Sequence, residues 1–206
     1  MLWIGLTGGI ASGKSSVARV FVRMGIPVVS ADVLAHEVLQ PGSEAAKRVV
    51  ELFDRSVRTK NGGIDRQRLG EIVFADSTGA KLRALEQILH PQVRKRADEL
   101  RKELSRKGYG LAVYEVPLLF EKEMQGLFDK IVCVAVRPDV QVQRLIARNH
   151  ISSVEAYQRI GKQAELSMKL AGSDIVIWNN GQTSDLERVA ESVARDLLTN
   201  SKRRQG

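Results

Sequence analysis

The residues Gly8 to Ser15 constrain this chain more than any other segment, because they read GGIASGKS and fit the pattern G-x-x-x-x-G-K-[ST]. The apolar run Leu2 to Leu6 precedes them, and helical spacing follows from Ser15. The pattern arises by chance in roughly one chain of this length per hundred. Its glycines let backbone N–H groups turn inward around phosphates at a helix N-terminus. We therefore expect a strand, a nucleotide phosphate-binding loop and a helix; the alternative is a glycine-rich turn that only joins two elements.

Two side chains of this loop suit phosphoryl transfer. We expect the Lys14 ammonium group to contact the β- and γ-phosphates and the Ser15 hydroxyl to coordinate Mg²⁺. The base-reading N-K-x-D element that GTPases need is absent from the sequence. The apolar run Leu111 to Val116 contains Glu115, but it lacks the terminal Asp usual in motor-type and transporter-type ATPases. The loop therefore favours a small kinase.

The rest of the chain alternates apolar runs with stretches of helical spacing, which indicates an α/β fold. The runs are nearly continuous, as in strands covered on both faces of a parallel sheet. With Leu2 to Leu6, five strands are expected, the others at Ile26 to Val29, Leu111 to Val116, Ile131 to Val136 and Ile175 to Trp178. The expected fold is a P-loop-type parallel five-stranded sheet flanked by helices.

Two helical insertions interrupt this core. Residues 32–107 exceed what a simple crossover needs and are expected to form a helical subdomain. Residues 149–172 open with a capping-box spacing at Ser152 and Glu155, and are expected to form a helical hairpin or lid. The core then consists of residues 1–31, 108–148 and 173–206, of which residues 202–206 resemble a loose tail.

Asp32 is the carboxylate best placed to accept a proton from an acceptor hydroxyl. It comes just after the second expected strand, as the phosphate loop comes after the first, and ligands gather at the carboxyl ends of parallel strands. The alternative is that Asp32 only caps the next helix, since Asp is a favoured N-cap residue. Position alone does not choose between these interpretations.

The charge balance predicts a polyanionic partner. The chain has 32 Lys and Arg against 24 Asp and Glu, a formal net charge of +8. An ATP-dependent nucleic-acid-binding module is the alternative from a different class, but no nucleic-acid motif is present. The basic run Arg94 to Lys107 is interpreted as a solvated amphipathic helix first and a nucleic-acid surface second.

The single cysteine, Cys133, is expected to be a buried thiol, and no apolar stretch reaches the length of a membrane span. We therefore expect a cytoplasmic protein with no membrane or nucleic-acid partner.

The sequence resembles the dephospho-coenzyme A kinases over nearly its whole length. The resemblance rests on segments in one order: LTGGIASGKS at Leu6 to Ser15, SADVLAHEVLQPG at Ser30 to Gly42, GGIDRQRLGEIVF at Gly62 to Phe74, LEQILHP at Leu85 to Pro91, VPLLFE at Val116 to Glu121, QRLIAR at Gln143 to Arg148 and SDIVIWNNG at Ser173 to Gly181. These segments together are far more specific than the phosphate loop alone.

The resemblance implies transfer of the γ-phosphoryl group of ATP to the ribose 3′-hydroxyl of dephospho-coenzyme A, the last step of coenzyme A synthesis. It implies that Asp32 is the catalytic base and that Arg144 neutralises charge on the transferring phosphates. It also implies that Asn179 lies near the adenine. The ATP-binding residues are then Gly8, Gly9, Ala11, Ser12, Gly13, Lys14, Ser15, Ser16 and Asn179, with Mg²⁺ at Ser15.

For the acceptor, the resemblance implies that residues 32–107 bind dephospho-coenzyme A. The VPLLFE segment looks like part of the acceptor pocket, although Pro117, Leu118 and Leu119 could equally be core. A helix-boundary position before Pro91 is expected for His90, and its place in a family motif leaves a substrate-side role open. A kinase of another small hydroxyl or nucleotide acceptor is the nearest rival, because its loop and Asp32 would look alike.

Some positions depart from the family pattern. Ser30 stands where the family commonly has an acid, but Asp32 is retained, so the assignment of the base survives. Asn149 and Ser173 replace a frequent acid and a frequent alanine, which puts lid affinity in doubt rather than reaction type. Ala11 replaces a frequent glycine, and we expect the backbone there to avoid positive φ.

Overall fold

The computed structural model describes residues 1–203 and divides the chain into two compact units. The first, here called the sheet unit, consists of Met1–Ser30 and Glu103–Gly206. The second, here called the helical unit, is Ala31–Lys102.

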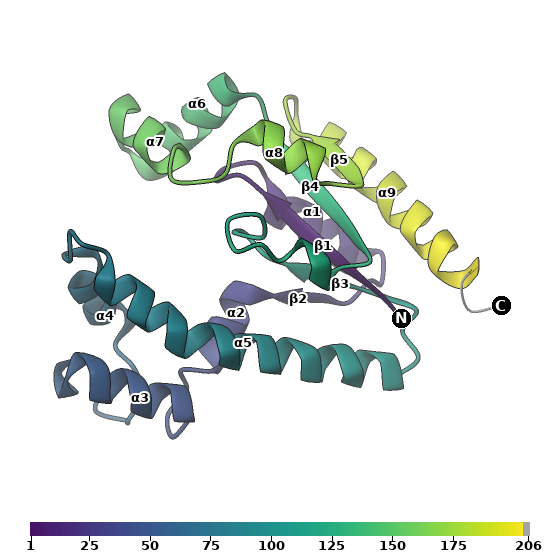
Figure 1. The fold of residues 1–206 in the computed structure, drawn as a ribbon. Helices are drawn as coiled ribbons and strands as arrows, with labels where there is room; N and C mark the ends of the chain where they lie inside the picture. The colour runs from purple at the N-terminus through teal and green to yellow at the C-terminus, as the bar shows by residue number, and fades with distance from the viewer. Residues whose placement is uncertain (204–206) are drawn as a thin grey trace. The chain divides into compact units, whose positions relative to one another are not determined.

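The sheet unit is built on five parallel strands (Figure 1). Their spatial order is β2-β3-β1-β4-β5, with bounds β1 Leu2–Gly8, β2 Val28–Ser30, β3 Leu111–Glu115, β4 Lys130–Ala135 and β5 Ile175–Trp178. The five predicted strands and their parallel arrangement are confirmed. All seven residues of β1 are buried, as expected for a central strand hydrogen-bonded on both sides and covered on both faces.

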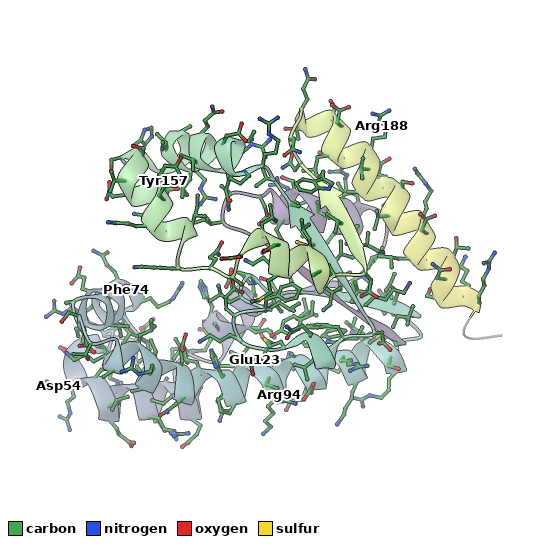
Figure 2. The ribbon with its side chains drawn as sticks, turned by 45° about the horizontal axis from the view of Figure 1, so that its top comes forward. Asp54, Phe74, Arg94, Glu123, Tyr157 and Arg188 are labelled. Atoms are coloured by element: carbon green, nitrogen blue, oxygen red, sulfur yellow. The ribbon has the colours of Figure 1, made fainter. Side chains whose placement is uncertain are left out.

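Helices α1 (Lys14–Arg23) and α9 (Thr183–Arg203) pack beside each other and contribute to one apolar core with the strands. Helix α1 buries Val17, Val20 and Phe21, and the chain leaves the helix at Gly25 with a φ of 78°, a conformation that suits glycine. The polar face of α9 points outward, as Arg188 does in Figure 2. The described part of α9 includes the first two residues of the expected tail, Lys202 and Arg203, while residues 204–206 lie outside the described part of the chain.

The remaining helices of the sheet unit are α6 (Pro138–Asn149), α7 (Ser153–Ile160) and α8 (Leu166–Ala171), besides the short 3-10 turn η2 (Gln125–Leu127). The predicted capping box is present, because Ser152 and Glu155 bond each other's backbone N–H groups. Helix α7 buries Ala156 against α6 and exposes Tyr157 (Figure 2). Residues 149–172 therefore contain two helices, as the sequence indicated.

The helical unit has a core of its own. It contains α2 (Ala31–Glu37), α3 (Glu44–Phe53), the 3-10 turn η1 (Arg55–Val57), α4 (Arg66–Phe74) and most of α5 (Ala80–Arg106). Val49 and Phe53 of α3, Leu69 and Val73 of α4 and Ile88 of α5 pack together. The pairs on α3 and on α4 are each four residues apart, which puts both members of a pair on one helix face.

The expected helix boundary at His90 is wrong, because α5 continues through Pro91. Proline removes one backbone hydrogen bond and crowds the preceding turn, which usually breaks a helix. Here the helix buries Ile88 before the proline and Ala97 after it, so tertiary packing on both sides offsets that loss. Arg94 of the basic run extends from α5 in Figure 2, in line with a solvated helix face.

The structure also bears on the expected burial of the single cysteine and on whether any helix could cross a membrane. Cys133 is fully buried on β4, and burial raises the pKa of its thiol. Across residues 1–203, each helix is either too short or too polar to cross a membrane.

Candidate active site

The loop from Gly8 to Lys14 joins β1 directly to α1, as the motif predicts. Gly13 occupies the N-cap position of α1 with a φ of 93°, which is unfavourable for residues with a Cβ atom. A Cβ atom on Gly13 would lie 2.3 Å from Asn179 Nδ2, and one on Gly9 would lie 2.7 Å from Gln141 Nε2. The glycines therefore serve the close approach of neighbouring side chains as well as the turn.

The expectation that Ala11 avoids positive φ is wrong, because its φ is 59°. A left-handed backbone costs an L-residue about 1–2 kcal/mol. Ile10 and Ala11 pack against the apolar cluster of Val142, Leu145 and Ala156, and the loop is hydrogen-bonded on both sides of this strained residue. The surrounding structure therefore holds alanine in a conformation that glycine would adopt freely.

Asn179 ties the phosphate loop to the end of β5. Its buried side chain donates from Nδ2 to the carbonyl oxygen of Ser12 at 2.8 Å. Arg144 on α6 donates to the backbone oxygen of Asn179 at 2.9 Å, to its Oδ1 at 3.4 Å and to the carbonyl oxygen of Gly181 at 3.3 Å. Two residues singled out by the resemblance thus lie together, with the Arg144 guanidinium bound to the segment 179–181.

Lys14 forms an ion pair with Glu115, with Nζ 2.5 Å from Oε1. The two side chains are only 11% and 12% exposed. Glu115 ends β3, and the parallel register pairs it with Leu6 of β1, which brings its carboxylate beside the phosphate loop. Ser15 Oγ lies 3.4 Å from the same carboxylate oxygen. Glu115 is therefore a site residue that the sequence reasoning left without a role, although an acid at the end of an apolar strand was the signal for it.

The oxygens of Ser15 and Glu115 fit a Mg²⁺ ion. Mg²⁺ prefers oxygen ligands and usually takes only one or two from the protein, the others coming from water and substrate phosphates. No group of three or more His, Cys, Asp or Glu side chains suited to a metal occurs within residues 1–203.

The other predicted site residues divide between the two units. Asp32 is an exposed residue in the first turn of α2, two positions beyond the end of β2, so it lies inside the helix and does not cap it. His90 is an exposed residue in the middle of α5.

The residues of the VPLLFE segment differ in their exposure to solvent. Leu119 is fully buried and belongs to the core, Leu118 is 38% exposed, and Pro117 is half-buried. The core interpretation therefore holds for Leu119, while Leu118 presents its side chain to solvent.

Comparison with known proteins gives this arrangement a family. The model of the dephospho-CoA kinase family matches residues 2–185. The chain is 44% identical to a dephospho-CoA kinase of Bacillus licheniformis over 90% of this chain and 92% of the relative. It is 43% identical to that of Geobacter sulfurreducens over 92% of this chain and 95% of the relative.

This chain belongs to the dephospho-CoA kinase family. Solved structures agree: a Thermus thermophilus protein superposes with a TM-score of 0.74 at 35% identity, covering 95% of this chain and 97% of that one. A dephospho-CoA kinase from Campylobacter jejuni superposes with a TM-score of 0.75 at 26% identity, covering 96% of this chain and 98% of that one. The P-loop kinase fold expected from the sequence is confirmed.

A second buried ion pair of this family member lies beyond the phosphate loop. Lys169 on α8 is 2% exposed, and its Nζ is 2.9 Å from Glu121 Oε1. The same oxygen accepts the backbone N–H of Ala164 at 2.8 Å, while the buried Oε2 has no hydrogen-bond partner within the described residues. Burial by itself would raise the pKa of Glu121, but the bonds from Lys169 and from backbone N–H groups outweigh it and lower that pKa below its ordinary value of 4.5.

The ion pair predicts a pH-dependent contribution to stability. Because the folded-state pKa of Glu121 is lowered, its contribution is present above pH 4.5 and is lost as the pH falls through the lowered pKa. Glu121→Gln leaves Lys169 buried without a counter-charge, and we expect it to reduce the free energy of unfolding by about 3 kcal/mol at pH 7. Denaturant titrations of both proteins between pH 7 and pH 3 measure this difference, which should shrink below pH 4.5.

Glu123→Gln is the matched control, since Glu123 is an exposed carboxylate two residues away (Figure 2). It should leave the free energy of unfolding nearly unchanged at every pH. A Glu121→Gln deficit that is the same at pH 7 and pH 3 would contradict the charge-based explanation.

Proposed function

We propose that this chain transfers the γ-phosphoryl group of ATP to the ribose 3′-hydroxyl of dephospho-coenzyme A, giving coenzyme A and ADP, the last step of coenzyme A synthesis. The observation that carries the proposal is the family match over residues 2–185. The formed phosphate loop, with Lys14 and Ser15 beside Glu115, supports it independently.

In the proposed reaction, the ATP phosphates bind to backbone N–H groups of the loop between Ala11 and Ser16. Lys14 exchanges the Glu115 carboxylate for the β- and γ-phosphates and neutralises charge that develops on them. Ser15 and Glu115 together would hold Mg²⁺, which supplies electrostatic stabilisation of the phosphates when it is bound.

Asp32 accepts the proton of the 3′-hydroxyl as the oxygen attacks the γ-phosphorus, and ADP departs with the β–γ bridging oxygen. Arg144 contributes positive charge at the nucleotide, with its guanidinium held by Asn179 and Gly181. Asn179 lies near the adenine in this proposal. Residues 149–172 act as a lid that excludes water from the transferring group.

The helical unit binds the acceptor in this proposal. A cavity of about 850 Å³ within that unit has both charged and apolar walls. Such a lining suits the diphosphate and the pantetheine arm of dephospho-coenzyme A. Its basic side chains are Lys47, Arg55, Arg58 and Lys81, and its apolar ones include Ala46, Val50 and Ile72. Pro117, Leu118 and His90 are further candidates for acceptor contacts. The protein would act in the cytoplasm, without nucleic-acid or membrane partners.

An acceptor survey tests the proposed substrate. ADP release should be strong with dephospho-coenzyme A and should require Mg²⁺ and ATP. Adenosine, nucleoside monophosphates and shikimate should give rates near the background, because they lack the pantetheine and diphosphate groups. Strong turnover of a nucleoside monophosphate with none of dephospho-coenzyme A would favour the rival kinase class. Retention on DNA with a steep salt dependence would favour the nucleic-acid module.

Lys14→Ala should lower kcat by at least about a thousandfold, because the transferring phosphates lose their fixed positive charge. The circular dichroism spectrum should stay that of the wild type. The matched control is Lys202→Ala, which removes an exposed lysine of α9. Near-normal turnover in Lys14→Ala would remove the phosphate-loop assignment.

Asp32→Asn should lower kcat by roughly a hundredfold or more with little change in ATP affinity, since a general base acts mainly in the transition state. Steady-state kinetics and calorimetric titration with ATP measure the two quantities. Asp98→Asn, an exposed acid on α5, is the control within the same unit. Unchanged turnover would reduce Asp32 to a helix residue without a catalytic role.

A further inference from the structure

Two glutamine side chains hold the two peptide groups on either side of Ile10 in the phosphate loop. Gln163, between α7 and α8, accepts the backbone N–H of Ile10 through Oε1 at 2.8 Å. Gln141, a buried residue of α6, donates from Nε2 to the carbonyl oxygen of Ile10 at 2.8 Å. Both backbone groups of Ile10 are therefore bonded within the protein, so the N–H group of Ile10 is not free to bind phosphate.

The peptide that Gln141 binds leads directly into the strained residue of the loop. Ala11 adopts a φ of 59°, which alanine rarely adopts without support. Fixing the carbonyl of Ile10 fixes the orientation of the peptide plane that leads into Ala11. Gln141 thus fixes the peptide that enters Ala11, and Gln163 fixes the peptide before it. Together they restrict Ile10 and support the backbone conformation that an alanine at position 11 disfavours.

Gln163 is itself held in place by the ion pair described above. The backbone N–H of the next residue, Ala164, donates to Glu121 Oε1, which also binds Lys169. Lys169 is almost fully buried, so this connection between α7 and α8 is attached to the sheet unit through a fixed charge pair. The phosphate loop and the segment 163–169 therefore form one continuous hydrogen-bonded network.

We propose that Gln163 and Gln141 are positioning residues that hold the phosphate loop in its nucleotide-binding conformation and offset the left-handed strain at Ala11. They act on the backbone and not on the phosphates. In thermodynamic terms, they raise the fraction of the protein that is competent to bind ATP, which lowers the apparent dissociation constant. For turnover, the inference rests on the proposed function; for nucleotide binding it does not.

The test uses the full chain and measures ATP affinity by calorimetry without acceptor. Gln163→Ala should raise the dissociation constant of ATP roughly five- to tenfold, the loss of one hydrogen bond that biases the loop. KM for ATP should rise similarly, while kcat at saturating ATP stays within about twofold, because bound phosphates then hold the loop themselves. The melting temperature should change little, since Gln163 is only half-buried.

Ala11→Gly supplies the decisive second variant. Glycine adopts positive φ without strain, so the loop should need the glutamine less. In the Ala11→Gly background, Gln163→Ala should change the ATP dissociation constant by no more than about twofold. Gln143→Ala, which truncates an exposed glutamine of α6, is the control and should bind ATP like the wild type.

Two outcomes would overturn the inference. If Gln163→Ala binds ATP as tightly as the wild type, the hydrogen bond does not hold the loop. If the loss is equally large with alanine or glycine at position 11, Gln163 acts on the nucleotide directly and not through the backbone. A wild type that binds ATP but does not phosphorylate dephospho-coenzyme A would contradict the proposed function alone, because the binding measurements would still decide the role of Gln163.

Discussion

The burial of β1 between two parallel neighbours is the constraint on which the rest of the sheet unit depends. This strand is hydrogen-bonded to β3 on one side and to β4 on the other, and all its residues are buried. The carboxyl end of β1 is therefore held in place, and it fixes the position at which the phosphate loop begins. The register with β3 brings Glu115 to Lys14, and the approach of β4 and β5 brings Asn179 to Ser12. The site is thus a consequence of strand order.

Each of the two largely buried lysines described above in the sheet unit forms an ion pair with a glutamate. Lys14 is paired with Glu115, and Lys169 is paired with Glu121. The two pairs differ in what surrounds them. The first lies beside the phosphate loop, where a phosphate replaces the carboxylate in the proposed reaction. The second also holds a backbone N–H group and stays structural. The formal charge of +8 is therefore a poor guide to the free charge at the site.

Sequence reasoning predicted the elements well where the pattern was local. The five strands, the helix after the loop and the capping box at Ser152 follow from apolar runs and short-range spacing. It failed at Pro91 and Ala11, where packing outweighs the local preference of the residue. It also left Leu119 equally between the acceptor pocket and the core, whereas the structure buries this residue in the core. The sequence beside a motif does not show in which direction an apolar side chain points.

By itself, the sequence determined the phosphate loop, the α/β class and, through its many shared segments, the family. These depend on residue types at fixed spacing, which the chain carries wherever it folds. Only the tertiary structure decided the roles of Glu115, Gln141, Gln163 and the Glu121–Lys169 pair. Gln163 is 153 positions from Ile10 in the chain. An amide that far along the sequence has no periodicity to mark it, and only the packing of α6 and α7 against Ile10 and Ala11 brings it to the loop.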